Sequence, residues 1–131
     1  MWLDDLKDYI DSLELDIDVF ETSLPSAPVN CLVLLEYAGL APTDYTSQPA
    51  VELYMRTAPE EYADNYSIFK KIVSALTEIG NENGDLSEGL IVNDTNFLRI
   101  YTPQSGVTSL GDDENGNPLL SQNIYIVMED K

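Results

Sequence analysis

The sequence predicts one α+β domain over residues 1–131, with two main helices packed on a mixed or mostly antiparallel sheet of about four to six strands. Three observations support this fold class. A chain of 131 residues suits a single domain with its own core, and its 44% hydrophobic content is too high for a disordered chain. Two segments show helical spacing of apolar residues. The segments with strand patterns do not alternate regularly with these helices, which argues against a doubly wound fold.

Residues 2–13 show the pattern of an amphipathic helix. Apolar side chains recur there at helical spacing, namely Trp2, Leu6, Tyr9, Ile10 and Leu13. The opposite side carries four acids, Asp4, Asp5, Asp8 and Asp11. Negative charge in the first turn is favoured by the helix dipole. We expect the apolar stripe to pack on the sheet, and the acidic side to face solvent, another subunit or DNA.

A second helix is predicted from about Thr57 to Ile79. Thr57 and Glu60 have the spacing of a capping box, in which each side chain accepts from the other residue's backbone N–H. Pro59 in the first turn costs no helical hydrogen bond, and Gly80 is a typical helix stop. The apolar residues of this segment cover nearly half of the helix circumference, so we expect it to be well buried.

Strands are predicted from alternation of apolar residues and from short apolar runs. Alternation indicates strands at residues 15–20, 51–56, 96–101 and 119–128. The apolar run at 31–37 predicts a central strand that is buried on both faces, and 90–92 a further short strand. Val51, Leu53 and Met55 are expected to point inward. Proline and glycine predict loops at 38–49 and 104–118.

The charge balance limits the possible partners. The net charge is −18, from 24 acids against 6 bases, with no histidine. This excess argues against duplex binding and against anionic membrane surfaces, because both need clusters of lysine and arginine. It favours basic partners or cations. Neither a signal peptide nor an apolar run long enough to span a bilayer is visible, so the cytoplasm of the producing cell is the expected location.

Motifs for catalysis or for a cofactor are missing from the sequence. Without histidine the usual serine triad is excluded, and a lone Cys31 can form neither an intrachain disulfide nor a cysteine–histidine zinc site. Cys31 is expected to be a buried, inert thiol. We therefore expect neither an enzyme nor a cofactor. A loose divalent-cation site at Asp112, Asp113 and Glu114, or at Asp16 and Asp18, stays open.

Two arginines stand out in so acidic a chain. Arg56 and Arg99 each lie on a predicted strand and point away from its aliphatic face. We expect them to pair with carboxylates, either within the chain, where the energetic effect is small, or across an interface between subunits, where it is larger.

The order and spacing of several segments resemble the tail terminator, or minor capsid, proteins of long-tailed bacteriophages. The resemblance covers most of the chain. It is carried by residues 28–39 with a glycine- and proline-containing loop at 39–42, the strand at 49–56, the acidic-tyrosine helix start at 59–63, and residues 103–105, 110–117 and 121–123. The family often has arginine at the position of Asn117.

The resemblance implies a structural subunit of the virion, present in the host cytoplasm during assembly. It implies a self-associating ring, commonly a hexamer, that caps the tail tube and joins it to the head-completion or connector protein at the head–tail junction. DNA passes through the lumen of such a ring. We hypothesise that an acidic lumen keeps this DNA from sticking, with channel-facing acids drawn from Asp4, Asp5, Asp8 and Asp11 or from Asp112 to Glu114.

Two alternatives stay open. The loop with Asp112 to Glu114 can instead dock on a basic partner surface, because long loops commonly serve such contacts. The whole chain can instead be an acidic DNA-mimic inhibitor of a nucleic-acid-binding enzyme, which would be a monomer or dimer with carboxylates spaced like phosphates.

Overall fold

A computed structural model describes residues 1–43, 45–103 and 106–129. In chain order, its elements are α1 (Trp2–Ser12), β1 (Asp18–Glu21), β2 (Cys31–Leu40), β3 (Thr46–Arg56), the short 3-10 helix η1 (Pro59–Glu61), α2 (Tyr62–Thr77), β4 (Leu90–Val92), β5 (Thr95–Tyr101), β6 (Thr108–Asp112) and β7 (Pro118–Glu129). The predicted α+β class with two main helices is confirmed. The sheet has seven strands, which is more than expected.

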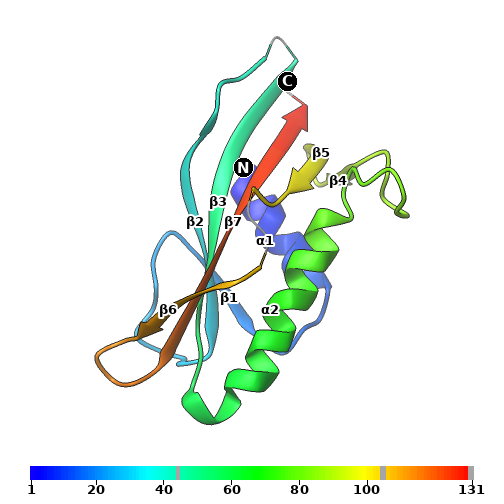
Figure 1. Cartoon of the computed structure of the whole chain (residues 1–131). Coiled ribbons are helices and arrows are strands. Elements are labelled where there is room, and N and C mark those ends of the chain that lie inside the picture. The colour runs from blue at the N-terminus through cyan, green and yellow to red at the C-terminus, as the bar shows by residue number, and fades with distance from the viewer. Residues whose placement is uncertain (44, 104–105, 130–131) are drawn as a thin grey trace.

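Strand β7 lies in the middle of the sheet, whose order is β1-β2-β3-β7-β5-β4. One edge of β7 pairs with β3 along most of its length. The other edge pairs with two strands in succession, with β6 near Ser121 and with β5 from Tyr125 onward. All pairs are antiparallel except β1 with β2, so the sheet is mixed. Figure 1 shows the resulting curled sheet, with the β6–β7 hairpin projecting at the lower left.

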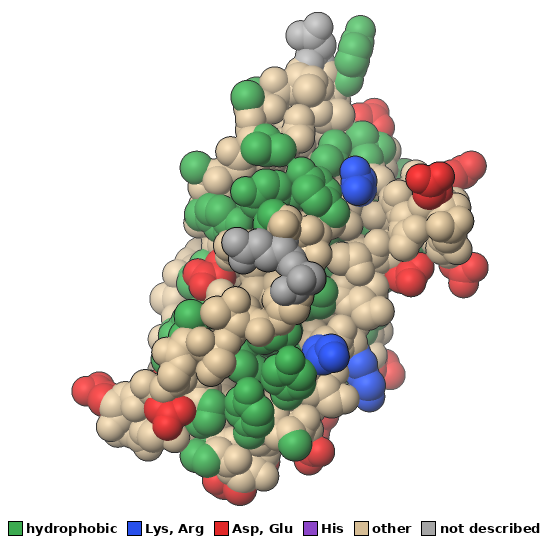
Figure 2. Space-filling model, in the orientation of Figure 1, with side chains coloured by type: hydrophobic (Ala, Val, Ile, Leu, Met, Phe, Trp, Pro, Cys, Tyr) green, Lys and Arg blue, Asp and Glu red, His purple; other side chains and the backbone are tan. Residues whose placement is uncertain are grey.

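Both helices cover the same side of this sheet. In Figure 1, α1 lies behind β3 and β7, and α2 runs along the right-hand side. Neither helix lies in front of β3 and β7, and we call this front side the helix-free face. Figure 2, in the same orientation, shows hydrophobic side chains across the middle of the helix-free face and acidic side chains mainly around its rim.

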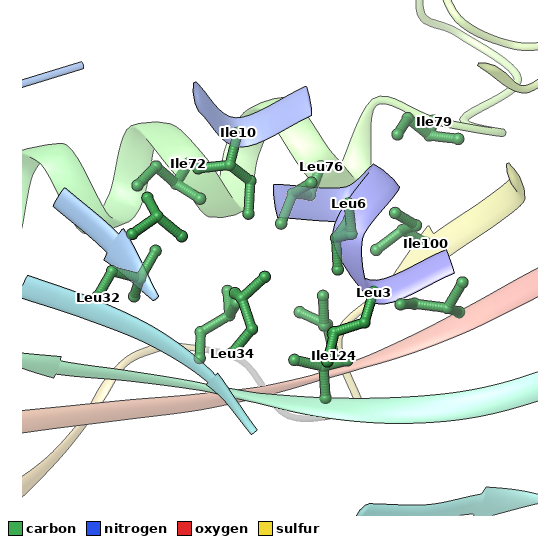
Figure 3. Packing of buried hydrophobic residues seen from close by; sticks show 14 of the residues in the cluster. Leu3, Leu6, Ile10, Leu32, Leu34, Ile72, Leu76, Ile79, Ile100 and Ile124 are labelled. Carbon is green, nitrogen blue, oxygen red and sulfur yellow. The ribbon is translucent and has the colours of Figure 1, made fainter. Parts of the chain in front are cut away.

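The core fills the space between the two helices and the inner face of the sheet (Figure 3). The helices contribute residues at helical spacing, Leu3, Leu6 and Ile10 from α1 and Phe69, Ile72 and Leu76 from α2. From β3 come the three residues expected to point inward, Val51, Leu53 and Met55, which are fully buried. Because each buried methylene contributes about 0.8 kcal/mol, this layer is the main stabilising term of the fold.

Strand β2 is buried on both faces from Cys31 to Leu34, as expected, and is paired on both edges. It is not at the centre of the sheet, and the long loop expected at 38–49 does not follow it. It lies next to the edge strand β1, and the central strands are β3 and β7. Strands β2 and β3 instead continue into a long hairpin, in which Leu40 is paired with Gln48 across a β-bulge. Gly39 belongs to this bulge, where a Cβ would lie 2.0 Å from the carbonyl oxygen of Gln48. Glycine therefore permits a close strand contact here and does not end the strand.

The long loop expected at 104–118 is also partly wrong. Residues 108–112 form β6, which pairs with β7, and Gly111 has a φ of +84° within an irregular stretch of that pairing. The short segment between β5 and β6 remains, and its residues 104–105, like residue 44 of the other expected loop, lie outside the described residues. The strand expected at 15–20 begins later, at Asp18, and the other expected strands are confirmed.

The second helix starts without the expected capping box. No side-chain cap bond forms at η1 or at α2, both of which lie within the described ranges, and the Thr57 hydroxyl donates to the Ala58 carbonyl oxygen. The helix does end before Gly80, which has a φ of +76°. Cys31 is buried as expected, and this burial raises the pKa of its thiol. Among the described residues, no helix is long and apolar enough to cross a membrane.

Candidate functional site

The acids of α1 do not all lie on a solvated face, as the sequence pattern suggested. Asp5 is only 7% exposed, and its carboxylate accepts hydrogen bonds from the Asn93 side-chain amide at 2.8 Å and from the Thr95 hydroxyl. The same Asn93 amide also donates to Asp8 at 3.2 Å. Asn93 sits in the turn between β4 and β5 with a φ of +52°. Asp5 therefore fastens α1 to this hairpin and is not available to face a lumen.

The other acids of α1 are exposed, and two of them lie close to a further acid on β1. Asp11 accepts from Lys7 at 2.7 Å, and Asp4 lies 3.8 Å from the N-terminal amino group. Partial burial of Glu21 raises the pKa of its carboxyl group, and the neighbouring Asp4 and Asp8 raise it further. Asp4, Asp8 and Glu21 therefore form a cluster of acids on the side of the molecule where α1 lies, with Lys7 as a neighbouring cation.

The acids of the β6–β7 turn fall into two kinds. The Asp113 carboxylate accepts from the backbone N–H groups of Asn115 and Asn117, both at 2.9 Å, and these bonds lower the pKa of Asp113. Gly116, with a φ of +81°, closes the turn through its N–H to the Asp113 carbonyl oxygen. Asp113 thus holds the turn in shape. Asp112 and Glu114 are exposed on either side of it.

A cation site at this turn finds no support among the described residues, where no group of three or more acids, cysteines or histidines is arranged to hold a metal ion. The same holds for Asp16 and Asp18. Both are exposed beside a small groove that also includes Glu61 and Asp64.

Arg56 is a structural residue. Contrary to the expectation, it forms no ion pair with a carboxylate within the described residues. It is 7% exposed, and its guanidinium donates to the carbonyl oxygens of Val29 at 2.9 Å and of Pro25 and Pro28 at 2.8 Å. Arginine suits this position because its fixed fork of donors can serve several carbonyls at once. Arg56 therefore pins the segment between β1 and β2 to the end of β3.

A second buried polar group fixes the start of α2 and was not predicted. The side-chain oxygen of Asn30 accepts from the Ala58 backbone N–H at 2.7 Å and from the Asn65 amide at 3.0 Å. Asn65 also donates to the Thr57 hydroxyl at 2.7 Å. Asn30 is far from Ala58 and Asn65 in the sequence, and Asn65 is buried within a helix. No local spacing of residues therefore indicates this network. It replaces the capping box expected from Thr57.

Arg99 is exposed and lies beside aromatic rings. The expected pairing with a carboxylate is not found for it within the described part of the chain. Its guanidinium sits 4.7 Å from the centre of the Tyr101 ring, and Lys70 on α2 lies 5.8 Å from the centre of the Tyr66 ring. All four residues line one groove of about 750 Å³ between α2 and β5. We call them, together with the exposed Lys71, the basic-aromatic strip. Figure 2 shows its lysine and arginine side chains over α2 and β5.

Replacing Arg56 should destabilise the fold, because three backbone carbonyl groups lose their donor. We expect Arg56→Met to lower the free energy of unfolding by about 3 kcal/mol in urea titrations. The matched change Arg99→Met removes a cation from the surface and should cost less than about 1 kcal/mol. Equal effects of the two changes would show that Arg56 does not hold the segment.

The raised pKa of Glu21 makes a prediction about pH. The folded state binds this proton more tightly than the unfolded state, so the contribution of Glu21 to stability falls as pH rises through the raised value. Glu21→Gln should therefore raise the free energy of unfolding at pH 7. The expected gain is only about 0.5 kcal/mol, because solvent screens the charge of this partly exposed group. The gain should shrink as pH is lowered towards 4.5, the ordinary glutamate value.

Thermal unfolding of wild type, Glu21→Gln and the control Glu82→Gln over this pH range checks the prediction. The control removes one exposed acid from the loop before β4 and corrects for the change in net charge. A gain for Glu21→Gln that equals the control at every pH would contradict a raised pKa of Glu21, whose causes are burial and the neighbouring acids.

A comparison with protein families gives a match that covers nearly the whole chain. The model of the family described as bacteriophage tail terminator protein matches residues 3–130, which is nearly the entire sequence. A search of curated proteins finds no match. The family match agrees with the resemblance of the sequence segments and decides against the enzyme class, because the family is structural. The chain belongs to the bacteriophage tail terminator protein family.

Proposed function

We propose that copies of this chain form a closed ring, commonly a hexamer in this family, that caps the finished tail tube and joins it to the head-completion or connector protein. The family match over residues 3–130 carries the proposal. As a tail terminator the protein is a virion component that associates with the tail tube. Our proposal goes beyond the family match in three respects: the ring, the contact with the head, and the minor capsid role at the head–tail junction.

The distribution of surface features supports a ring. The β6–β7 hairpin projects on one flank of the molecule, and α2 lies on the other (Figure 1). A contact between two different surfaces repeats from copy to copy, and it closes into a ring when the rotation between neighbours allows it. With neighbours on these two flanks, α1 would belong to neither contact.

We further propose that the exposed acids of α1 face the lumen of the ring. Asp4, Asp8 and Asp11 form a negative patch with Glu21, and Lys7 is the one lysine on the same helix. A channel wall of this charge repels phosphate, so DNA would slide through without binding. Asp5 is left out of this proposal because it is buried against the β4–β5 turn.

The ring is tested by light scattering of the free protein and by negative-stain microscopy of purified tail tubes with and without it. We expect a closed ring at one end of each tube, with a mass that is an integer multiple of the chain mass of 14.6 kDa. A protein that stays monomeric in both settings and leaves the tube ends uncapped would sink the proposal.

Neutralising the lumen acids should make DNA stick. We expect the triple change Asp4→Asn, Asp8→Asn and Asp11→Asn to increase DNA retention by assembled rings several-fold in a filter-binding assay at about 0.1 M salt. The control replaces Glu82, Asp85 and Glu88 by their amides, because these exposed acids lie in the loop before β4. Equal retention by the two variants would place the α1 acids away from the channel.

A further inference from the structure

We propose that the basic-aromatic strip of one copy receives the β6–β7 hairpin of the next copy, through Asp112, Glu114 and Leu110. The contact rests on the proposed ring and names the two surfaces that build it. The proposal assigns a partner to the surface cations of α2 and β5. The fold itself does not require these cations.

The cations of the strip have no ionic partner within the described part of the chain. The ion pairs found there are those of the N-terminal amino group with Asp4 and of Lys7 with Asp11. Lys70, Lys71 and Arg99 take part in neither, although the chain has 24 acids. Random placement on so acidic a surface would bring carboxylates close to them. Glu82 lines the same groove as Lys70 and Arg99, yet neither cation forms an ion pair with it. The three cations are therefore available to acids of another molecule.

The chemistry of the strip suits a protein partner. Arg99 and Lys70 each lie over a tyrosine ring, and the rings of Tyr101 and Tyr125 pack edge to face at 5.6 Å. Tyrosine and arginine are enriched at the centres of protein interfaces, where a flat apolar ring and a planar cation bury area at low entropic cost. The groove lined by Tyr66, Lys70, Arg99 and Tyr101 also includes the apolar side chains of Val73 and Val107. A matching partner therefore carries both acids and an apolar residue.

The β6–β7 hairpin has this combination. Asp112 and Glu114 are exposed at its tip, and Leu110 on β6 is 48% exposed beside them. Every residue of β6 is exposed, so the outer side of the hairpin lacks a partner within the described chain. The bonds to Asp113 keep the turn in one shape before any contact, which lowers the entropic cost of docking.

Within one copy, the described acids of the β6–β7 hairpin form no ion pair with the cations of the basic-aromatic strip. Figure 2 shows the acidic side chains of the hairpin at the lower left and the basic side chains of the strip to the right of the centre. Two complementary surfaces on opposite flanks favour contacts between copies, repeated in one direction. DNA is the less suitable occupant, because three cations on a chain of net charge −18 cannot offset the repulsion of phosphate by the remaining acids.

The contact is tested by exchanging the charges of its two sides. One variant carries Lys70→Glu and Arg99→Glu, and the other carries Asp112→Lys and Glu114→Lys. For each variant alone, the protein concentration needed for ring formation should rise at least about tenfold, because like charges then face each other. Sedimentation velocity measures this concentration. Mixed in equal amounts, the two variants should assemble again as alternating copies. Asp113 stays unchanged because it shapes the turn.

The hairpin variant makes the sharper prediction. Its two lysines reduce the net negative charge, so general self-repulsion predicts stronger association, whereas the proposed contact predicts weaker association. The control, Asp85→Lys with Glu88→Lys, makes the same change of charge in the exposed loop before β4. It should leave assembly as strong as in wild type or stronger. Circular dichroism and thermal unfolding confirm that each variant is folded.

The outcomes separate this contact from the ring itself. If wild type forms rings and both exchange variants form them equally well, the contact is wrong and the ring stands. If the mixture fails to assemble, the two surfaces do not meet. If Lys70→Glu with Arg99→Glu abolishes DNA binding and leaves assembly intact, the strip serves DNA and the proposal is overturned. A wild-type chain that never self-associates overturns both.

Discussion

The packing of both helices on one face of a single sheet is the constraint from which the other features follow. The apolar stripes of α1 and α2 and the inner residues of β2, β3, β7 and β5 make one core, in which Leu6, Leu34 and Leu76 are fully buried. The opposite face therefore has neither helix over its central strands, and it carries hydrophobic side chains with acids mainly around its rim (Figure 2). A chain with its core on one side of a sheet keeps the other side available for contacts with other molecules.

The surface charge is distributed unevenly within this frame. Acids on α1 and at the hairpin tip are exposed, whereas Asp5 and Asp113 are used to hold turns in place. The bases are divided in the same way, since Arg56 holds a segment of backbone and Arg99 remains at the surface. Net charge alone thus does not tell which ionic groups shape the fold and which meet a partner. The hydrogen-bond partners of each group make that distinction.

The sequence predicted those parts of the fold that depend on local periodicity. The helices at Trp2–Ser12 and Tyr62–Thr77, the inward residues of β3 and the long strand β7 all follow from spacing along the chain. The loops at 38–49 and 104–118 were partly wrong, because Gly39 and Gly111 lie at irregularities of paired strands, where proximity to another strand decides the conformation. That proximity is not encoded in local spacing.

The candidate site divides in the same way. Arg99 and Lys70 stack on tyrosines two and four residues away, so the strip follows from strand and helix periods once the elements are known. The roles of Arg56 and Asp5 instead depend on hydrogen-bond partners that are distant in the sequence.

We hold that this protein acts through surfaces of its helix-free face and its flanks, with the helix core as support. Hydrogen exchange measured on the free protein and on the protein bound to tail tubes tests this most directly. Amides of β6 and of the β6–β7 turn, together with those around Lys70 and Arg99, should become more protected on assembly, while those of α1 stay unchanged. Protection that appears only in α1, or in no segment, would contradict this role of the surfaces.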